Sequence, residues 1–317
     1  MTDKSVQKYT APAGGWGALK SVTKSWIASE KPLKNLHALL KTNQDHGFDC
    51  PGCAWGESPE NGLVKFCENG AKAVNWESSA RQVGPAFFAR YTVSQLLEHS
   101  DYWLEDQGRL YHPMQYNPAT DKYTEISWDA AFALIAQHLN QLASPNEAEF
   151  YTSGRTSNEA AYLYQLFVRA FGTNNFPDCS NMCHEASGKA LSQTLGIGKG
   201  SVTLDDLYKA ELVMVVGQNP ATNHPRMLTA LEKCKKNGGQ IIAVNPLPEA
   251  GLLKFTNPQS PYKLLTGGTK IADVFVPVTI NGDVALFKAI LLKLLEKEEA
   301  EDMKKKLEEQ GAKVEFK

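Results

Sequence analysis

Apolar side chains recur at helical spacing in the central part of the chain. Three segments show this period: residues 127–142, 156–172 and 184–196. Ser127 stands where an N-cap residue belongs, and Thr156 with Glu159 has the spacing of a capping box. Gly172 follows the last apolar turn of the second segment and predicts its C-terminal end. The pattern therefore predicts three amphipathic helices.

Shorter apolar runs predict strands. Residues 211–217 and 240–246 are continuously apolar and rich in Val and Ile, which is typical of strands buried in a parallel sheet. Residues 224–239 between them have a helical pattern, so the three segments predict a parallel pair with a right-handed crossover. Residues 148–154 predict one more short strand. The expected class is α/β, with ligands at the carboxyl ends of the strands.

Composition and charge exclude several kinds of partner. The 317 residues carry a formal net charge of −2, which gives no electrostatic signature of nucleic-acid binding. No apolar run approaches the ~20 residues that span a bilayer. The start of the chain, MTDKSVQKYTAPAGGWGALK, has neither an apolar core nor a twin arginine. We therefore expect a cytoplasmic protein without a membrane partner.

Three of the six cysteines gather near the start of the chain. Cys50 and Cys53 form a Cys-Pro-Gly-Cys motif, and Cys67 follows later in the same segment. Residues 46–75 are rich in Gly, Pro and Asn, which predicts mostly loop. Two thiolates on such a turn can reach one metal centre, and a third from a nearby loop fits an iron–sulfur or zinc site.

Three kinds of site stay open for these thiols. A zinc site needs a fourth ligand, for which His46 and Glu57 are the nearby candidates. A dithiol redox motif is expected between a strand and a helix start, which this glycine-rich context does not resemble. An iron–sulfur cluster is the third possibility.

Cys183 and His184 are adjacent, where a polar loop meets a predicted helix. The positive end of a helix favours the thiolate form of a cysteine. A thiolate is a strong ligand for a soft metal, and a neighbouring imidazole can transfer a proton. The structural alternative is a buried cysteine beside a histidine that caps the helix.

A polar loop follows the first predicted parallel strand. It begins with Gly217 and Asn219 and leads to His224 at the start of the next helix. A glycine after a strand lets backbone N–H groups approach a phosphate, and the helix offers its N-terminus to an anion. Asn245 ends the second strand, where a ribose or base is bound in such folds. A plain turn without a ligand is the alternative.

Taken in order, these constellations resemble the molybdopterin oxidoreductases, in particular the formate dehydrogenase-like, YdeP-like branch. CPGCAW with its downstream cysteine resembles their N-terminal cluster segment. YTSGRTSNEAAYLYQLFVRAFGTNNFPDCSNMCHEASG is similar to the segment that delivers their molybdenum-ligating cysteine or selenocysteine. VVGQNPATNHPR and AVNP are similar to their pterin guanine dinucleotide loops. The resemblance extends over residues 40–295.

The resemblance implies a role for each candidate residue. Cys50, Cys53 and Cys67 would ligate a 4Fe–4S cluster, Cys183 would ligate molybdenum, and His184 would be the catalytic histidine. The implied cofactor is molybdenum bis(molybdopterin guanine dinucleotide). Residues expected along this cofactor are Arg155, Asn158, Glu159, Asn174, Asn175, Gly217, Asn219, His224 and Asn245.

Two positions depart from the family pattern. Glu57 stands where a further cluster cysteine is usual, and Asn69 stands where a lysine follows the last cluster cysteine. Lys65 and Lys72 are the candidates to replace that lysine. Both departures lie at the expected cluster, so they affect the predicted route of the electrons and not the predicted pterin site.

The resemblance also implies the organisation of the chain. Residues 1–115 are expected to form the cluster-binding segment, and residues 116–295 a Rossmann-like, parallel-sheet region that binds the pterin dinucleotide. Residues 296–317 predict a charged helix and a short strand, and they resemble the C-terminal end of the bacterial ribosomal stalk protein. We therefore expect a truncated or chimeric chain that binds pterin weakly or not at all by itself.

The expected activity is the two-electron oxidation of formate, or of a similar small substrate, at molybdenum. The electrons would pass through the cluster to an electron-acceptor protein. Two other classes stay open: a non-catalytic α/β fragment that binds a nucleotide or nothing, and a zinc or dithiol redox protein. The molybdenum, iron and zinc contents of the protein distinguish the three.

Overall fold

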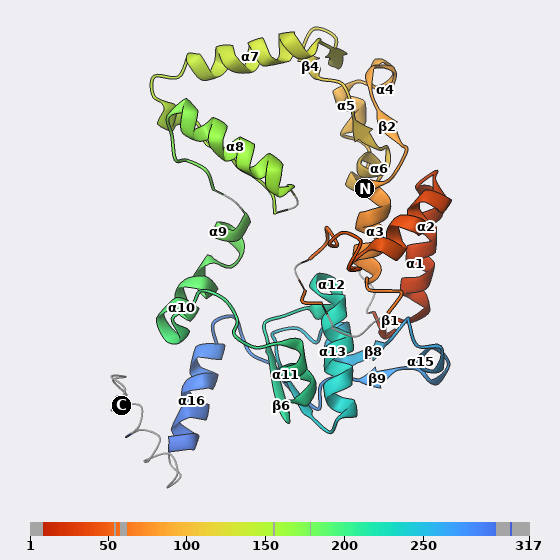
Figure 1. Ribbon diagram of the computed structural model, residues 1–317, viewed down its shortest axis with the longest axis vertical. Helices are drawn as coiled ribbons and strands as arrows, with labels where there is room; N and C mark the ends of the chain where they lie inside the picture. Colours follow the sequence, from red (N-terminus) through yellow and green to blue (C-terminus); the bar gives the residue numbers. More distant parts are fainter. Residues whose placement is uncertain are drawn as a thin grey trace. The chain divides into compact units, whose positions relative to one another are not determined.

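Figure 1 shows the computed structural model of the chain, which describes residues 9–53, 55–57, 62–154, 156–177, 179–295 and 305. Contacts between residues divide the chain into two compact units. The first unit joins Met1–Lys20 to Thr203–Lys317, and the second is the continuous stretch Ser21–Val202. Helices and strands occur in both, so the protein is of the mixed α/β class. The functional division expected at residues 115 and 295 remains a prediction.

A three-stranded parallel sheet is the centre of the first unit. In the order β10–β7–β6, its strands are Val274–Val276, Gln240–Val244 and Leu212–Val216. Helix α13 (Pro225–Lys236) connects β6 to β7, which confirms the predicted strand–helix–strand order and the parallel pair. Leu228 and Leu231 of this helix are buried together with Ile241 of β7, because the apolar face of the helix packs on the sheet.

Strand β6 differs from the continuously buried strand that its apolar sequence predicts. Val213 and Val215 are buried, whereas Leu212 is 53% exposed. Burial at every second residue means that one face of the strand is covered by the described part of the unit.

A second sheet joins the beginning of the chain to its later part. Strand β1 (Ala13–Gly14) runs parallel to β8 (Lys254–Thr256), which runs antiparallel to β9 (Thr269–Lys270). Helix α1 (Gly15–Ala28) follows β1 directly and continues into the second unit. The other described helices of the first unit are α11 (Leu204–Lys209), α12 (Pro220–Asn223), α14 (Ala250–Leu253), α15 (Pro261–Thr266) and α16 (Asp283–Leu295).

The second unit begins with a small helical core. Helices α2 (Pro32–Lys41) and α3 (Glu68–Glu77) pack against each other through Leu39, Ala71 and Val74. Val22, Trp26, Ala38 and Phe66 surround these three residues. Helix α3 shortens the loop that the sequence predicts over residues 46–75, because the loop ends at Cys67.

Short elements follow this core. They are β2 (Gln82–Val83), α4 (Pro85–Arg90), α5 (Val93–Leu96), α6 (Asp101–Asp106), β3 (Arg109–Leu110), β4 (Met114–Asn117) and β5 (Lys122–Glu125). Strands β4 and β5 form an antiparallel hairpin, and β2 pairs with β3 in parallel. Phe87, Tyr91 and Trp103 pack ring against ring and hold α4 to α6.

Three longer helices confirm the central part of the sequence prediction. They are α7 (Trp128–Asn140), α8 (Asn158–Phe171) and α10 (Glu185–Leu195), with the 3₁₀ turn η1 (Pro145–Glu147) and the short α9 (Cys179–Cys183) between them. Ser127 caps α7 through the N–H of Ala130, and Gly172 ends α8 in the left-handed conformation.

Two local predictions in this region are wrong. The N-cap of α8 is Ser157, which accepts from the N–H of Ala160, so the capping box of Thr156 and Glu159 does not form. Residues 148–154 form no strand within the described chain. Phe150 instead packs against rings of α8, and its N–H donates to the carbonyl of Asn175.

No helix in the described part of the chain is long and apolar enough to cross a membrane. The helix and strand expected in residues 296–317 lie outside the described residues, except for Lys305.

Candidate functional site

The structure brings the three N-terminal cysteines to one place in the second unit. Cys50 and Cys53 lie in the loop after α2, and Cys67 is the N-cap residue of α3. The N–H of Gly70 donates to Cys67 Sγ over 3.4 Å, and the N–H of Gly52 donates to Cys50 Sγ over 3.4 Å. Backbone donors of this kind favour the negatively charged form of a sulfur ligand.

Gly70 lies between two of the sulfurs. A Cβ atom at this position would be 2.7 Å from Cys50 Sγ and 3.8 Å from Cys67 Sγ. The first distance is well below van der Waals contact, so any residue with a side chain would displace Cys50. Glycine is therefore required where the cysteine loop meets the first turn of α3.

Nearby groups, including the other two thiols, change the pKa of Cys67. Burial raises the pKa of Cys67, the N–H groups of Gly70 and Asn69 oppose this rise, and the neighbouring Cys53 and Cys50 add to it. Cys53 and Cys50 are therefore near enough to influence the ionisation of Cys67. No group of three or more His, Cys, Asp or Glu side chains in the described residues is arranged around a single metal ion.

Asn43 fixes the position of the cysteine loop. Its side-chain oxygen accepts from the N–H of Cys50 over 2.7 Å, and its side-chain nitrogen donates to the carbonyl of Lys65 over 2.6 Å. No local pattern marks this asparagine, since its partners lie up to 22 residues away. Lys72, one candidate for the missing lysine, pairs with Glu68 at 3.1 Å.

Cys183 and His184 lie between two helices. Cys183 is the last residue of α9 and is exposed, and His184 is the N-cap residue of α10. Within the described residues, the His184 side chain makes no capping hydrogen bond. The structural alternative required a buried cysteine and a capping histidine, and the structure has neither. An exposed thiol and an exposed imidazole are accessible to a ligand.

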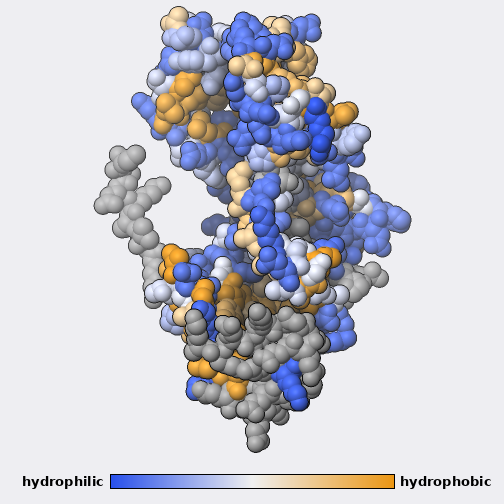
Figure 2. Space-filling view, turned by 90° about the vertical axis from the view of Figure 1, so that its left-hand side faces the viewer, coloured by the Kyte–Doolittle hydropathy of each residue, from blue (hydrophilic) through white to orange (hydrophobic). Residues whose placement is uncertain are grey.

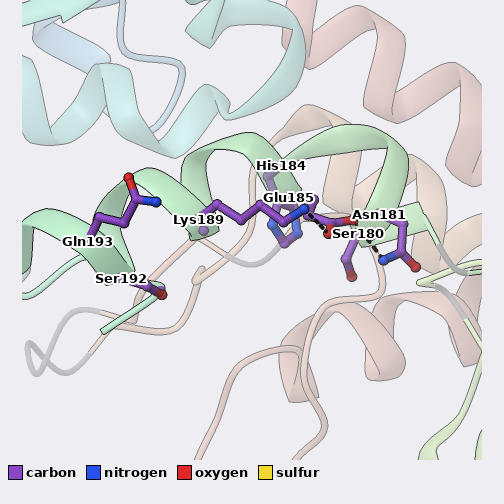
Figure 3. Close-up of a pocket in the computed structure, with 9 residues that line it drawn as sticks. Ser180, Asn181, His184, Glu185, Lys189, Ser192 and Gln193 are labelled. Carbon is purple, nitrogen blue, oxygen red and sulfur yellow. Dashed lines mark hydrogen bonds and ion pairs between the residues drawn. The ribbon is translucent and has the colours of Figure 1, made fainter. Parts of the chain in front are cut away.

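A cavity of about 530 Å³ runs along α10 beside this pair (Figure 3). Lys189 pairs with Glu185 at 3.1 Å, and Asn181 donates to the other oxygen of Glu185 over 3.0 Å. His184 lies at the same end of the cavity. The lining residues are Ser180, Asn181, His184, Glu185, Gly188, Lys189, Ser192, Gln193 and Gly198. Most of the lining surface is apolar, and a few polar groups, among them His184 and Lys189, lie along it, as is usual for ligand sites.

Asn174 and Asn175 line a second polar cavity of about 610 Å³. Both side chains also have local partners. Asn175 donates to the carbonyls of Asn146 and Ala148 over 2.8 and 3.2 Å, and Asn174 accepts from Arg169 over 3.3 Å. These contacts hold the loop before α9 to the turn that follows α7.

Three further residues near α8 were predicted to contact the cofactor. Asn158 and Glu159 are exposed in the first turn of α8. Arg155 lies outside the described residues.

In the first unit, Gly217, Asn219 and Asn245 lie together at the carboxyl ends of β6 and β7. Gly217 has a φ of +65°, and its N–H donates to the carbonyl of Val244 over 2.9 Å. Asn245 is buried and donates to the carbonyl of Gln218 over 3.0 Å. His224 follows at the junction of α12 and α13. The predicted polar edge therefore forms.

Glu249 belongs to this edge and was missed in the sequence. Its carboxylate accepts from the side-chain nitrogen of Asn219 over 2.9 Å. Asn219 also caps α12 by accepting from the N–H of Thr222. An acidic residue soon after the second strand is the signal that could have identified Glu249, because folds of this class bind a ribose there through a carboxylate.

Residues 109–257 match the family model described as molybdopterin oxidoreductase. This segment, a little under half of the chain, is similar to molybdopterin oxidoreductase domains. It contains Cys183, His184 and the edge from Gly217 to Glu249, whereas the cysteines at 50, 53 and 67 precede it. Both cavities described above lie within the matched segment.

Longer relatives carry similar sequence. An uncharacterized oxidoreductase of Mycobacterium tuberculosis is 58% identical over 268 residues, which are 84% of this chain and 34% of the relative. Protein YdeP of Escherichia coli is 48% identical over 298 residues, 94% of this chain and 39% of the relative. The alpha subunit of F420-dependent formate dehydrogenase 2 of Methanococcus maripaludis is 34% identical over 126 residues, 39% of this chain and 18% of the relative. The chain thus spans 34% of the first of these relatives and 39% of the second.

Proposed function

We propose that this chain is part of a molybdopterin-dependent oxidoreductase that oxidises formate or a similarly small substrate. The observation that carries the proposal is the exposed Cys183–His184 pair, of which His184 lines a cavity along α10, within the segment that matches the family model. The similarity to a formate dehydrogenase subunit supports formate over larger substrates.

Cys183 is the residue that would hold the metal. Its thiol is accessible at the end of α9, and sulfur ligands bind soft metals strongly. When bound, the molybdenum–pterin group supplies a two-electron acceptor. His184 accepts the proton that the substrate releases, since its imidazole lies next to Cys183 and faces the cavity. Lys189 and Asn181 supply donors for a carboxylate in the same cavity.

The three N-terminal thiols are proposed to hold a 4Fe–4S cluster. Gly70 leaves room between Cys50 and Cys67, and two backbone N–H groups point at sulfur, which fits cluster ligation. Electrons would leave through this cluster to an electron-acceptor protein. Glu57 stands where the family pattern has a further cluster cysteine.

The polar edge of the first unit is proposed to hold a guanine dinucleotide of the cofactor. Gly217, Asn219 and Asn245 supply backbone and amide groups, and Glu249 supplies an acceptor for ribose hydroxyls. His224 lies at the start of α13, where a phosphate is favoured. The family resemblance adds five further residues that would contact the cofactor: Arg155, Asn158, Glu159, Asn174 and Asn175.

A non-catalytic nucleotide-binding fragment is the second candidate. The observation in its favour is that the edge from Gly217 to Glu249 forms within one unit, while the chain spans only about a third of its long relatives.

Metal and nucleotide contents test both candidates. The chain would be produced anaerobically in a host that makes molybdenum cofactor, and its molybdenum, iron and guanine nucleotide would be quantified. The oxidoreductase proposal expects all three in a full-length protein that carries this segment, together with reduction of a dye by formate. Guanine nucleotide without molybdenum or iron would instead support the fragment, and stoichiometric zinc without iron would contradict the cluster.

A further inference from the structure

Helix α2 ends in a tight turn that leads into the cysteine loop. The N–H of Phe48 donates to the carbonyl of Lys41 over 3.2 Å, and the N–H of Asn43 donates to the carbonyl of Phe48 over 2.8 Å. A Cβ atom at Gly47 would lie 1.7 Å from the carbonyl oxygen of Lys41, so only glycine fits there. Backbone contacts therefore hold the turn in one conformation.

Asn43 has a left-handed backbone conformation within this turn. Its φ is +56°, a region that residues with a Cβ atom rarely adopt and that asparagine tolerates better than most. Glycine would adopt the same conformation with less strain. The turn alone therefore does not explain an asparagine at this position, and the reason lies in its side chain.

The carboxamide of Asn43 joins the two ends of the cysteine-bearing segment. Its oxygen accepts from the N–H of Cys50 over 2.7 Å, and its nitrogen donates to the carbonyl of Lys65 over 2.6 Å. Lys65 precedes Cys67 by two residues. A carboxamide offers an acceptor and a donor on one planar group, whereas a carboxylate offers acceptors only. Asn43 thus ties Cys50 to the residues that lead into Cys67.

Gln44 adds a weaker attachment beside it. Its side-chain nitrogen donates to the carbonyl of Gly62 over 2.9 Å and to that of Leu63 over 3.4 Å. These bonds are exposed to water, whereas both bonds of the Asn43 side chain are partly buried. Water competes for an exposed hydrogen bond and reduces its net contribution. Asn43 therefore carries most of the attachment.

This attachment matters for any metal ion that binds both Cys50 and Cys67. Such an ion must close the chain segment between the two thiols, and the entropy lost on closure opposes binding when the segment is free. When the segment is already held by the fold, this loss no longer falls on the binding step. Replacement of residues that hold metal ligands in place typically lowers metal affinity by about 10–100-fold.

We propose that Asn43 is a positioning residue for metal binding by the N-terminal thiols, because its carboxamide holds Cys50 and the approach to Cys67 together before the metal arrives. It acts through the backbone and does not touch the metal. The inference rests on the proposed role of these thiols as metal ligands, and it depends neither on the kind of metal centre nor on formate oxidation.

Cobalt(II) is the probe for the test, because thiolate ligands give it a strong sulfur-to-metal absorbance band and it needs no cluster assembly. The reduced full chain would be titrated without oxygen, and loss of the band in Cys67→Ser would assign it to this site. Asn43→Gly permits the same backbone conformation and removes the carboxamide. It should weaken cobalt binding about tenfold and lower the absorbance per bound cobalt.

A second variant and a matched control complete the test. Asn43→Asp keeps the acceptor for Cys50 but loses the donor to Lys65, so it should weaken cobalt binding about threefold. Asn281 also has a positive φ, +68°, and is exposed in the other unit. Asn281→Gly should leave both cobalt readouts unchanged, and circular dichroism would check the fold of every variant.

The outcomes separate this inference from the proposed cluster. Equal affinity and absorbance in Asn43→Gly and Asn281→Gly would overturn the inference, and so would unchanged binding in Asn43→Asp. Absence of the thiolate band from the unchanged protein would overturn it as well. A cobalt site that depends on Asn43, in a chain that assembles no iron cluster, would support the inference and contradict the cluster.

Discussion

Gly70 lies where any side chain would collide with a cysteine sulfur. Glycine is required here because the cysteine loop contacts the start of α3. The spacing of the cysteines in the sequence does not reveal this contact. A residue without a functional group therefore decides whether Cys50 can lie next to the first turn of α3.

Substitution of Gly70 by alanine should damage the cysteine site. The added Cβ atom would lie 2.7 Å from Cys50 Sγ, so the loop must move. We expect a loss of about 1–3 kcal/mol in the free energy of unfolding and a marked fall in iron bound after anaerobic reconstitution. Iron analysis and visible absorbance measure the outcome. Gly62→Ala is the control, since a Cβ atom at Gly62 meets nothing within 4 Å; equal iron in both variants would argue against the cluster site.

Cys183 and His184 should affect turnover differently in a full-length protein that carries this segment. Cys183→Ala should abolish formate oxidation and leave the fold intact, because the side chain is exposed. His184→Ala should lower kcat more than it raises KM, since a proton acceptor acts mainly in the transition state. The measurement is the kcat and KM of each variant for formate in steady-state kinetics. Met182→Ala, at the exposed neighbouring position, should have little effect, and near-normal activity of Cys183→Ala would contradict the proposed role.

Sequence analysis found the functional groups of the site more readily than their supports. Residue type and spacing are enough to identify the cysteines, the Cys-His pair and the polar residues that follow strands. Asn43 and Glu249 have no such signature, since each acts through a hydrogen bond to a residue 7 to 30 positions away. Such partners are set by tertiary structure, which local pattern does not encode.

At the scale of elements, Asp273 joins α13 to the parallel sheet. It forms an ion pair with Lys235 of the helix, and its other oxygen accepts from the N–H of Ile241 in β7 over 2.9 Å. The hydrogen bond from Lys235 and then that from Ile241 lower the pKa of Asp273 below its ordinary value. This carboxylate therefore stabilises the packing of the helix on the sheet while it is ionised.

Replacement of Asp273 by asparagine should destabilise the protein in a pH-dependent way. A pKa lowered in the folded state gives stability that is complete above the ordinary value of 3.8 and is lost as the pH falls through the lower folded value. The pair is partly exposed, so the expected loss at neutral pH is only about 1 kcal/mol. Denaturant unfolding at several pH values measures the difference between variant and unchanged protein, which should vanish in acid. Asp205→Asn, in an exposed pair with Lys209, should cost less; an equal cost would contradict the argument.

The elements themselves were predicted where local pattern and tertiary contacts agree. The helices at residues 127–142, 156–172 and 184–196 formed because their apolar stripes are local signals. Ser127 and Gly172 end two of them as predicted. The strand at 148–154 did not form, because Phe150 packs among Tyr164, Phe167 and Phe171. A short apolar run carries too little information to choose between a strand and a packed loop.

At the scale of the whole molecule, several helices keep an apolar face uncovered by the described residues. Trp128, Phe132 and Ile135 of α7 are 54–60% exposed, and Figure 2 shows such apolar side chains on the surface. Helices α8 and α16 share this property through Tyr162, Leu163, Leu166, Val284, Leu291 and Leu292. Apolar patches of this kind mark surfaces that bind other protein or aggregate.

The chain studied alone should therefore bind a hydrophobic dye and associate with itself. The double variant Phe132→Gln and Ile135→Gln should reduce both effects while changing the free energy of unfolding by less than about 0.5 kcal/mol, because both side chains are exposed. Dye fluorescence and light scattering give the readout. Ala136→Gln, on the same helix, is the control; if it lowers dye binding as much as the double variant, the apolar face is not the cause.

The division into units could not have been predicted from local pattern. The family resemblance implies a boundary at residue 115, whereas contacts group the first residues with those from Thr203 onward. Pairing of a two-residue strand with a partner far along the chain leaves no periodic signal in either segment.

That same pairing of β1 with β8 has a consequence for the order in which the protein is made. Ala13 leaves the ribosome about 240 residues before its partner Phe255, on the order of tens of seconds at ordinary synthesis rates. The second unit, one continuous stretch, is complete in the meantime and is free to fold first. The opening segment must wait as an unpaired strand through that interval, which makes it the part of the nascent chain most open to chaperones and to mispairing.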